Sequence, residues 1–380
     1  MAVIDIGGYS LKVLNKNKTY DFVLPRNCIG GTFTIPFIDK AKLSYVLARV
    51  KKEARVCECD LIIPDQWGRQ LFVVITNDEA QEKISNDYII WRSKDQIREE
   101  VYSGTKICAH VTGVQIGPDK KQHISAYLCL VKYEILNKVT DIFAQNGVII
   151  NSIELSSNAL YNYISASCAP GDNFAIINAG YEVCTVYFFI NSQPAYVRII
   201  ETAGKHFEQQ LLSDALLKTS VKLSDTGCAP VSNGVKAETL KPGGLETGHS
   251  GPETGLSVEN ILAPASAGLY EAEIKEKERY GAELAALKIF PSSADYAAFE
   301  AFEASKFPVR DNFLKEIHLT FEFFSSKFPA AKISQVFLSG GMCKFGGLDF
   351  FMTNFLDINT RYASEIEKIH NLALYASKEL

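Results

Sequence analysis

The sequence predicts an α/β protein of two related lobes, because a short meander of three strands occurs near its start and again near its middle. Each meander opens with an apolar strand, turns at a pair of small residues and returns as two further strands. The first comprises residues 2–6, 10–14 and 20–24, and the second comprises residues 173–178, 183–190 and 194–200. This internal duplication predicts two similar sheets within one chain.

Apolar residues at helical spacing predict the helices that cover these sheets. The predicted helices are 40–54, 132–145, 157–165, 274–287, 311–328 and 347–356. Asp311 is expected to cap the helix that it begins, since an aspartate side chain can accept from the first free N–H groups. A strand at 333–338 precedes the turn Ser339-Gly340-Gly341.

Residues 65–152 are expected to form an α+β unit inserted between the two meanders. Two alternating segments, 109–116 and 124–131, are joined by Gly117-Pro118-Asp119-Lys120-Lys121, which is a hairpin signal. The first lobe would then comprise residues 1–64 and 153–170, and the second lobe residues 171–380.

Two parts of the second lobe differ in character from the rest. Residues 221–255 contain 7 Gly and 3 Pro, and such a stretch buries too little apolar surface to order itself. A flexible insertion is therefore expected at about 221–260. The last helix, near 371–380, is expected to pack back on the body.

The composition excludes several classes of protein. The chain has 380 residues, of which 47% are hydrophobic and 22% charged, and a net charge of −5 without a basic stripe argues against nucleic acid as a partner. The nine cysteines are scattered, and Cys57 and Cys59 lack the second pair that a zinc site needs. The chain opens directly with a strand and has no run of about 18 apolar residues. We therefore expect neither a signal peptide nor a membrane span. The scattered cysteines indicate a reducing cytoplasm.

Three glycine turns at strand ends are the candidate chemical site. In the first, Gly7 and Gly8 let the backbone approach a phosphate, while Ser10 could donate a hydrogen bond and Lys12 supply positive charge. The second turn begins at Asn178 and repeats this layout, and the third contains Gly340 and Gly341. Each turn alone is ordinary, but two equivalent meanders facing one another would leave a cleft for a phosphate chain.

This order of motifs resembles that of the actin, Hsp70 and sugar-kinase superfamily, and five segments resemble the PilM-type proteins of type IV pilus assembly. These segments are IDIGGYSLKVL, AQNGVIINSIELSSNAL, YVRIIETAGKHFEQQL, NFLKEIHLTFEFF and ISQVFLSGGMCKFGGLDFFMTNFL. The resemblance covers most of the chain except about 220–310. It implies an actin-like ATPase fold (a duplicated ribonuclease H-like fold) with the inserted α+β subdomain that PilM shares with the division protein FtsA.

The resemblance also implies a site for ATP and magnesium. Asp5, Gly7, Gly8, Ser10 and Lys12 would face phosphate and metal, and Ala179, Gly180 and Thr185 would cover the other side. Gly204 and Glu208 would approach the ribose, and Gly340, Gly341 and Met342 would line the adenine. Magnesium would be held through water by Asp5 and Asn178.

Departures from the family pattern predict weak binding and little hydrolysis. Asn178 stands where the pattern has Asp, and an amide adds no negative charge and cannot take a proton. Met342 replaces a third small residue, and Ala203 replaces the first glycine of a pair. Loss of both ATP and magnesium is the alternative outcome.

The resemblance further implies a cytoplasmic adaptor at the inner membrane, held there indirectly by partners. Its partner would be the N-terminal cytoplasmic tail of a PilN-like membrane protein, captured in a groove that involves the inserted subdomain, with pilus motor ATPases as further candidates. Three alternatives stay open: the cytoplasmic domain of a type II secretion GspL protein, an FtsA-like division protein, and a kinase of the same fold.

Overall fold

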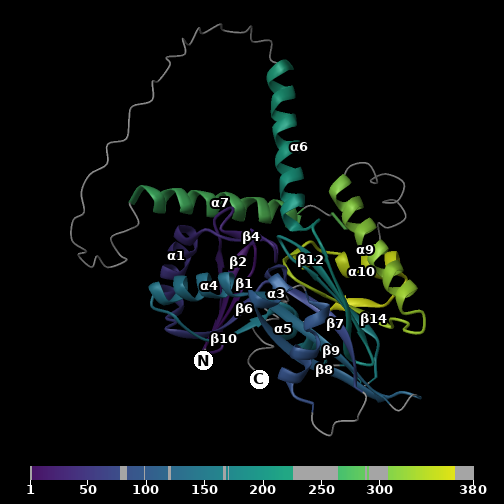
Figure 1. Cartoon of the computed structure of the whole chain (residues 1–380). Helices are drawn as coiled ribbons and strands as arrows, with labels where there is room; N and C mark the ends of the chain where they lie inside the picture. Colours follow the sequence, from purple (N-terminus) through teal and green to yellow (C-terminus); the bar gives the residue numbers. More distant parts are fainter. Residues whose placement is uncertain are drawn as a thin grey trace, which may run out of the picture.

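The computed structural model describes residues 2–77, 84–97, 99–118, 121–165, 168–169, 171–225, 264–286, 289–290 and 307–363. Within these ranges two five-stranded sheets form the body of the molecule, and a three-stranded sheet stands beside them (Figure 1). The α/β class predicted from the sequence is confirmed.

The first sheet has the strand order β10-β6-β1-β2-β3. Its strands are β1 (Ala2–Ile6), β2 (Ser10–Asn15), β3 (Lys18–Val23), β6 (Glu58–Ile63) and β10 (Ile149–Leu155). β1, β2 and β3 form an antiparallel meander, whereas β6 and β10 run parallel to β1. The parallel strands therefore end at one edge of the sheet, and the first glycine turn lies at that edge.

The second sheet repeats this plan with the order β13-β12-β11-β14-β15. Its strands are β11 (Phe174–Ala179), β12 (Cys184–Ile190), β13 (Gln193–Ile200), β14 (Gln335–Ser339) and β15 (Thr360–Tyr362). Again the first three strands are antiparallel neighbours, and the last two are parallel to β11. The predicted duplication is thus a duplication of sheet topology.

Apolar helices cover the first sheet. α1 (Lys40–Arg49) begins at Asp39, whose side chain accepts from the Lys42 N–H at 3.1 Å, and it buries Leu43, Val46 and Leu47. The predicted helix 40–54 changes to a π-helix over its last turn, Val50–Ala54. α4 (Tyr133–Gln145) packs against α1, and α5 (Ser156–Ser165) follows β10. A small hairpin, β4 (Ile29–Gly31) and β5 (Pro36–Ile38), was not predicted.

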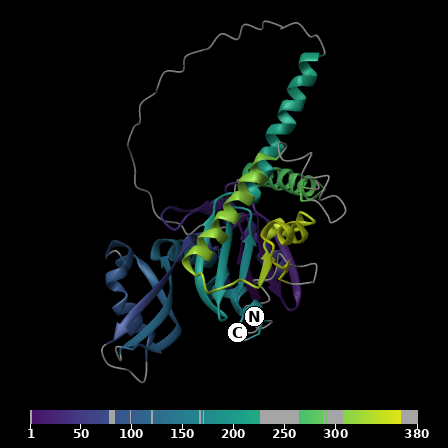
Figure 2. The same ribbon diagram turned by 90° about the vertical axis from the view of Figure 1, so that its right-hand side faces the viewer.

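The inserted unit has its own sheet and its own core. β9 (Gln122–Lys132) lies between β7 (Gly68–Asn77) and β8 (Thr105–Ile116), antiparallel to both. α2 (Asn86–Arg92) packs on one face through the buried Ile89, and α3 (Glu99–Ser103) lies beside it. Figure 2 shows this blue unit standing apart from the two larger sheets. We keep residues 65–152 as a proposed boundary, although β10 joins the first sheet from Ile149 onward.

The second lobe buries an aromatic core under α9 (Pro308–Lys327) and α10 (Leu348–Leu356). The prediction that Asp311 caps the first of these helices is wrong. Pro308 occupies the first helical turn with its φ already fixed, so α9 begins before Asp311, and Phe307 takes the capping position. The Asp311 carboxylate instead accepts from the guanidinium of Arg310 at 2.9 Å.

Two long helices border the predicted flexible insertion. α6 (Gly204–Asp225) continues into it, and α7 (Pro264–Ala286) starts ten residues before the predicted helix 274–287. Figure 1 shows α6 projecting from the body and α7 lying across its top. The remainder of the insertion, residues 226–263, and the predicted last helix at 371–380 lie outside the described residues. Within the described part of the chain, none of the helices combines the length and apolar character that a membrane crossing requires.

Candidate functional site

One cavity of about 430 Å³ lies where the glycine turns of the two sheets meet. The structure brings together on its wall every residue predicted for the site except Ala179. These lining residues are Asp5, Gly7, Gly8, Ser10, Lys12, Asn178, Gly180, Thr185, Gly204, Glu208, Gly340, Gly341 and Met342. Residues from the beginning, middle and end of the sequence therefore converge as predicted.

The first hairpin presents a carboxylate and an ammonium side by side. Asp5 and Lys12 are partners in the β1–β2 register, and Lys12 Nζ lies 3.6 Å from Asp5 Oδ2. The turn between them is closed by the Gly7 N–H, which donates to the Ser10 carbonyl at 3.0 Å. Burial raises the pKa of the Asp5 carboxyl, although the Lys12 charge opposes that effect. A further cation near Asp5 would therefore stabilise its charged form.

The second hairpin has the same closure but a different charge. The Gly180 N–H donates to the Val183 carbonyl at 3.1 Å, and Asn178 pairs with Thr185 on the neighbouring strand. Ala179 does not face the cavity: its side chain is fully buried in the second-lobe core. Side chains alternate along a strand, and Asn178 rather than Ala179 takes the cavity side, so the assignment of Ala179 to the phosphate side stays a prediction that its side-chain position does not support.

The third turn depends on a conformation that favours glycine. Gly340 has φ +95° and ψ 173°. A Cβ at this position would lie 2.5 Å from the Ala179 carbonyl oxygen and 2.7 Å from Asn178 Oδ1. The third turn therefore packs directly against the second, and Gly341 opens a short 3₁₀ turn, Gly341–Lys344, along the cavity.

Glu208 stands at the start of α6 and is 3% exposed. Its carboxylate accepts from the Tyr181 hydroxyl at 2.6 Å and from the Arg26 guanidinium at 3.0 Å. Burial and the neighbouring Glu208 carboxylate raise the pKa of Tyr181, so its hydroxyl stays a donor. Glu208 thus links the second hairpin to the first lobe.

Large side chains at the hairpin tips were missed by the sequence analysis. The Tyr9 and Tyr181 rings meet edge to face with centroids 5.4 Å apart. The Glu182 side chain lies against Gly8, and its carboxylate pairs with Lys205 at 3.0 Å. The similar layout of the two hairpins could have predicted these contacts, because the equivalent tips of two facing hairpins lie next to each other.

Asp65 is a second missed residue of the cavity wall. It lies two residues after the end of β6, so it reaches the same sheet edge as the end of β1. Its carboxylate accepts from the Ser157 N–H at 2.9 Å and from the Tyr187 hydroxyl of the second sheet. Burial raises its pKa. The parallel pairing of β1 and β6 would have predicted this position, but β6 was not assigned a role in the site.

The cavity wall combines glycines, charged side chains and apolar side chains. Glycines stand where a Cβ would meet the hairpin backbone, as at Gly180, where it would lie 2.7 Å from the Val183 carbonyl oxygen. Lys12 and Lys344 contribute charged side chains to the wall, and Leu284, Met342 and Phe345 contribute apolar ones. For magnesium, Asp5 offers a carboxylate and Asn178 an amide oxygen on the cavity wall. No cluster of three or more His, Cys, Asp or Glu suited to a metal occurs among the described residues, so most ligands would have to be water or phosphate.

Two duplicated lobes, each with an antiparallel meander and parallel strands beside it, and with glycine turns facing one cavity, define the actin-like ATPase fold. Over 99% of its length the chain is similar to a solved structure of a PilM–PilN type IV pilus biogenesis complex, with a TM-score of 0.62, 14% identity and 96% of that chain covered. The fold predicted from the resemblance to PilM is therefore confirmed.

Other comparisons are weaker. MreB5 of Spiroplasma citri bound to ADP aligns over 100% of this chain and 94% of its own, with 10% identity and a TM-score of 0.38. The cytoplasmic domain of EpsL, from the type II secretion system of Vibrio cholerae, aligns over 53% of this chain and 71% of its own, with 8% identity and a TM-score of 0.34. No protein-family model matches the sequence. No curated protein matches it either.

Proposed function

We propose that this chain is an actin-like adaptor of a type IV pilus or related secretion platform. It binds an adenine nucleotide in its cleft and docks the cytoplasmic tail of a PilN-like membrane protein. The single observation that carries the proposal is the convergence of three distant glycine turns on one cavity, in a chain similar to PilM over 99% of its length. The protein acts in the cytoplasm and reaches the inner membrane through its partners.

In this proposal ATP lies in the cavity with its phosphates toward the first two hairpins. Lys12 and Ser10 bind phosphate oxygens, and Asp5 holds magnesium through water, with Asn178 as a neutral neighbour. Glu208 and Gly204 lie toward the ribose, and Gly340, Gly341 and Met342 toward the adenine. The nucleotide stabilises the meeting of the two lobes.

Hydrolysis of the bound nucleotide is expected to be slow, because Asn178 cannot act as a general base. A water attacking phosphate needs a group that orients it and accepts its proton, and Asn178 cannot accept one. The Asp65 carboxylate accepts from the Ser157 N–H and the Tyr187 hydroxyl, and we assign it a structural role at the base of the cleft. Nucleotide therefore serves as a structural ligand rather than a consumed substrate.

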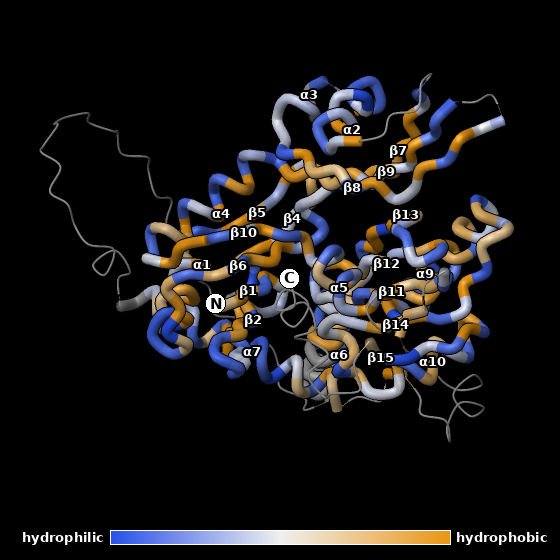
Figure 3. The backbone as a smooth tube through the Cα atoms, turned by 90° about the horizontal axis from the view of Figure 1, so that it is seen from below, coloured by the Kyte–Doolittle hydropathy of each residue, from blue (hydrophilic) through white to orange (hydrophobic). Residues whose placement is uncertain are grey.

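The tail is proposed to dock where the β4–β5 hairpin meets the inserted unit. Lys132 Nζ, at the end of β9, donates to the Thr34 carbonyl at 2.6 Å, and its ammonium lies 5.7 Å from the centre of the Phe33 ring. Beside this contact three large apolar side chains are exposed: Ile35 (75%), Phe37 (45%) and Tyr133 (46%). Figure 3 shows β4 and β5 next to α4. Exposed apolar side chains at a junction between two units suit an extended apolar tail.

The substitution Ile35→Asp tests this docking site. It should weaken binding of a synthetic peptide with the N-terminal sequence of the PilN-like protein from the same organism by roughly tenfold or more, since a buried apolar anchor is replaced by a charge. Titration calorimetry with the folded variant gives the affinity.

Ile116→Asp is the matched control. Ile116 is 69% exposed and lies at the far end of β8, so the same change there should leave peptide affinity unaltered. Weakening by Ile116→Asp alone would move the docking site to the free β8 edge. No peptide binding by the unaltered chain would refute the adaptor proposal itself.

A further inference from the structure

α7 connects the two lobes across the mouth of the cavity. Its C-terminal part belongs to the second lobe, where Leu284 is buried in the core. Its N-terminal part lies on the first lobe: the Tyr270 ring meets the Tyr45 ring at 5.5 Å, and Glu273 pairs with Lys42 at 3.2 Å. Figure 1 shows α7 running over the first sheet toward the base of α6. The helix therefore cannot move with one lobe without leaving the other.

Lys277 occupies the middle of this helix and is 1% exposed. Its ammonium donates to three backbone carbonyls of the first lobe: Leu24 and Tyr9 at 3.2 Å, and Gly8 at 3.4 Å. It also lies 4.7 Å from the Tyr9 ring centre and 4.5 Å from that of Tyr181. Burial lowers the pKa of Lys277 to about 8, which leaves it mainly protonated at neutral pH. Burying an ammonium is costly unless it is hydrogen-bonded, so these partners stabilise Lys277 in its buried position.

These bonds fix the direction of the peptide groups in the first glycine turn. In a trans peptide the N–H points away from the carbonyl of the same group. The Gly8 carbonyl accepts from Lys277, and the Tyr9 carbonyl accepts both from Lys277 and from the Leu24 N–H at 2.9 Å, so the N–H groups of Tyr9 and Ser10 are directed to the opposite side. Consecutive N–H groups that point one way form an anion-binding surface.

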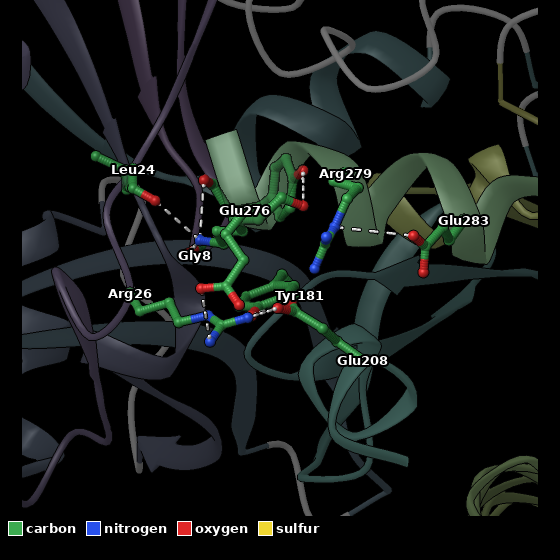
Figure 4. A network of polar contacts seen from close by, with 10 residues as sticks. Gly8, Leu24, Arg26, Tyr181, Glu208, Glu276, Arg279 and Glu283 are labelled. Carbon is green, nitrogen blue, oxygen red and sulfur yellow. Dashed lines mark hydrogen bonds and ion pairs between the residues drawn. The ribbon is translucent and has the colours of Figure 1, made fainter. Parts of the chain in front are cut away.

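A second set of ionic contacts reinforces the connection (Figure 4). Arg26 of the first lobe lies between Glu208 of α6, at 3.0 Å, and Glu276 of α7, at 3.6 Å. Glu208 in turn accepts from the Tyr181 hydroxyl. First lobe, second lobe and α7 are therefore joined by one continuous network beside the cavity.

We propose that α7 is a strap that holds the cleft closed without nucleotide, and that Lys277 is a positioning residue that fixes the first glycine turn in its anion-binding conformation. The positioning role of Lys277 rests on the proposed nucleotide site, whereas the role of α7 as a strap does not. When a turn is preorganised, the free-energy cost of ordering it on ligand binding is smaller.

The strap is tested first without nucleotide, by amide hydrogen exchange followed by mass spectrometry. Lys277→Met should accelerate exchange in the segments 7–11 and 180–184 by roughly tenfold or more, because three charge-assisted hydrogen bonds are lost. The double variant Glu273→Gln/Glu276→Gln removes only partly exposed ion pairs and should accelerate the same segments to a smaller degree, even if Lys277→Met fails to fold.

Glu283→Gln is the control on the same helix. Glu283 is half-exposed and pairs with Arg279 of the same helix at 3.8 Å, so its loss should leave both hairpins unchanged. Figure 4 shows Glu283 beyond Arg279, on the side away from Arg26. Unchanged exchange in the hairpins of the double variant and of any folded Lys277→Met would overturn the strap.

The positioning half is tested by titrating the same folded variants with magnesium and ADP. Lys277→Met should weaken ADP binding by roughly tenfold, and Glu283→Gln should not. Equal affinity of Lys277→Met and the unaltered chain would overturn the positioning role. If the unaltered chain binds no nucleotide, the nucleotide site and the positioning role both fail, while accelerated exchange would still support the strap.

Discussion

Gly340→Ala should lower the free energy of unfolding by about 3 kcal/mol and abolish nucleotide binding. Gly340 has a backbone conformation that is essentially confined to glycine, and forcing another residue into it costs about 1–3 kcal/mol. The new Cβ would also lie 2.5 Å from the Ala179 carbonyl oxygen, which belongs to a central strand and cannot retreat. The third turn would shift away from the second, and the cavity would lose its shape. Chemical denaturation and nucleotide titration measure the two effects.

Gly341→Ala is the paired control, one residue further along the same cavity wall. A Cβ there meets nothing within 4 Å, so stability should change by no more than about 0.5 kcal/mol. Equal stability of the two alanine variants would show that the contact between the second and third turns is not maintained in solution.

Asp5→Asn should weaken magnesium-dependent nucleotide binding by roughly tenfold or more while leaving the protein at least as stable at neutral pH. Burial raises the pKa of Asp5 in the folded state, so the folded chain binds a proton more readily than the unfolded chain does. The free energy of unfolding therefore falls as the pH rises from the unfolded pKa to the folded pKa, and the cost persists above it. Asparagine removes this cost together with the charge that magnesium needs.

Asp21→Asn provides the comparison for Asp5. Asp21 also lines the cavity and pairs with a lysine, Lys344 at 3.8 Å, but its side chain is 30% exposed, against 9% for Asp5. Its replacement should change affinity and stability little. A clear loss of stability in Asp5→Asn, measured by thermal unfolding at several pH values, would contradict the conclusion that burial dominates at this carboxylate.

The duplicated meanders could be predicted because their turns carry the signal locally. A strand such as Ala2–Ile6 is apolar throughout, and Gly7-Gly8 marks its end. Repetition of that pattern at Asn178 then predicted which residues face one cleft, and all but Ala179 line it. Ala179 does not line the cavity because a motif gives a position in the sequence, whereas the alternation of the strand decides which side chain reaches the cavity.

Long-range contacts could not be predicted from the same patterns. Lys277 lies in a stretch to which no motif applied, and nothing near it in the sequence indicates three carbonyls more than 250 residues away. Asp65 reaches the cavity only because β6 pairs with β1 in parallel. Pro308 shows a local failure of another kind, since the start of α9 was assigned to Asp311 although proline is a stronger marker of a first helical turn.

The most direct test of the account is to identify the nucleotide that the protein retains. The purified full chain is incubated with ATP and magnesium, freed of excess ligand by rapid desalting, and its bound nucleotide is identified by chromatography. We predict intact ATP at close to one molecule per chain, because we propose the cavity as a nucleotide site and because Asn178 cannot accept the proton of an attacking water. Retention of no nucleotide would contradict the binding site, and steady release of ADP over many turnovers would contradict the role assigned to Asn178.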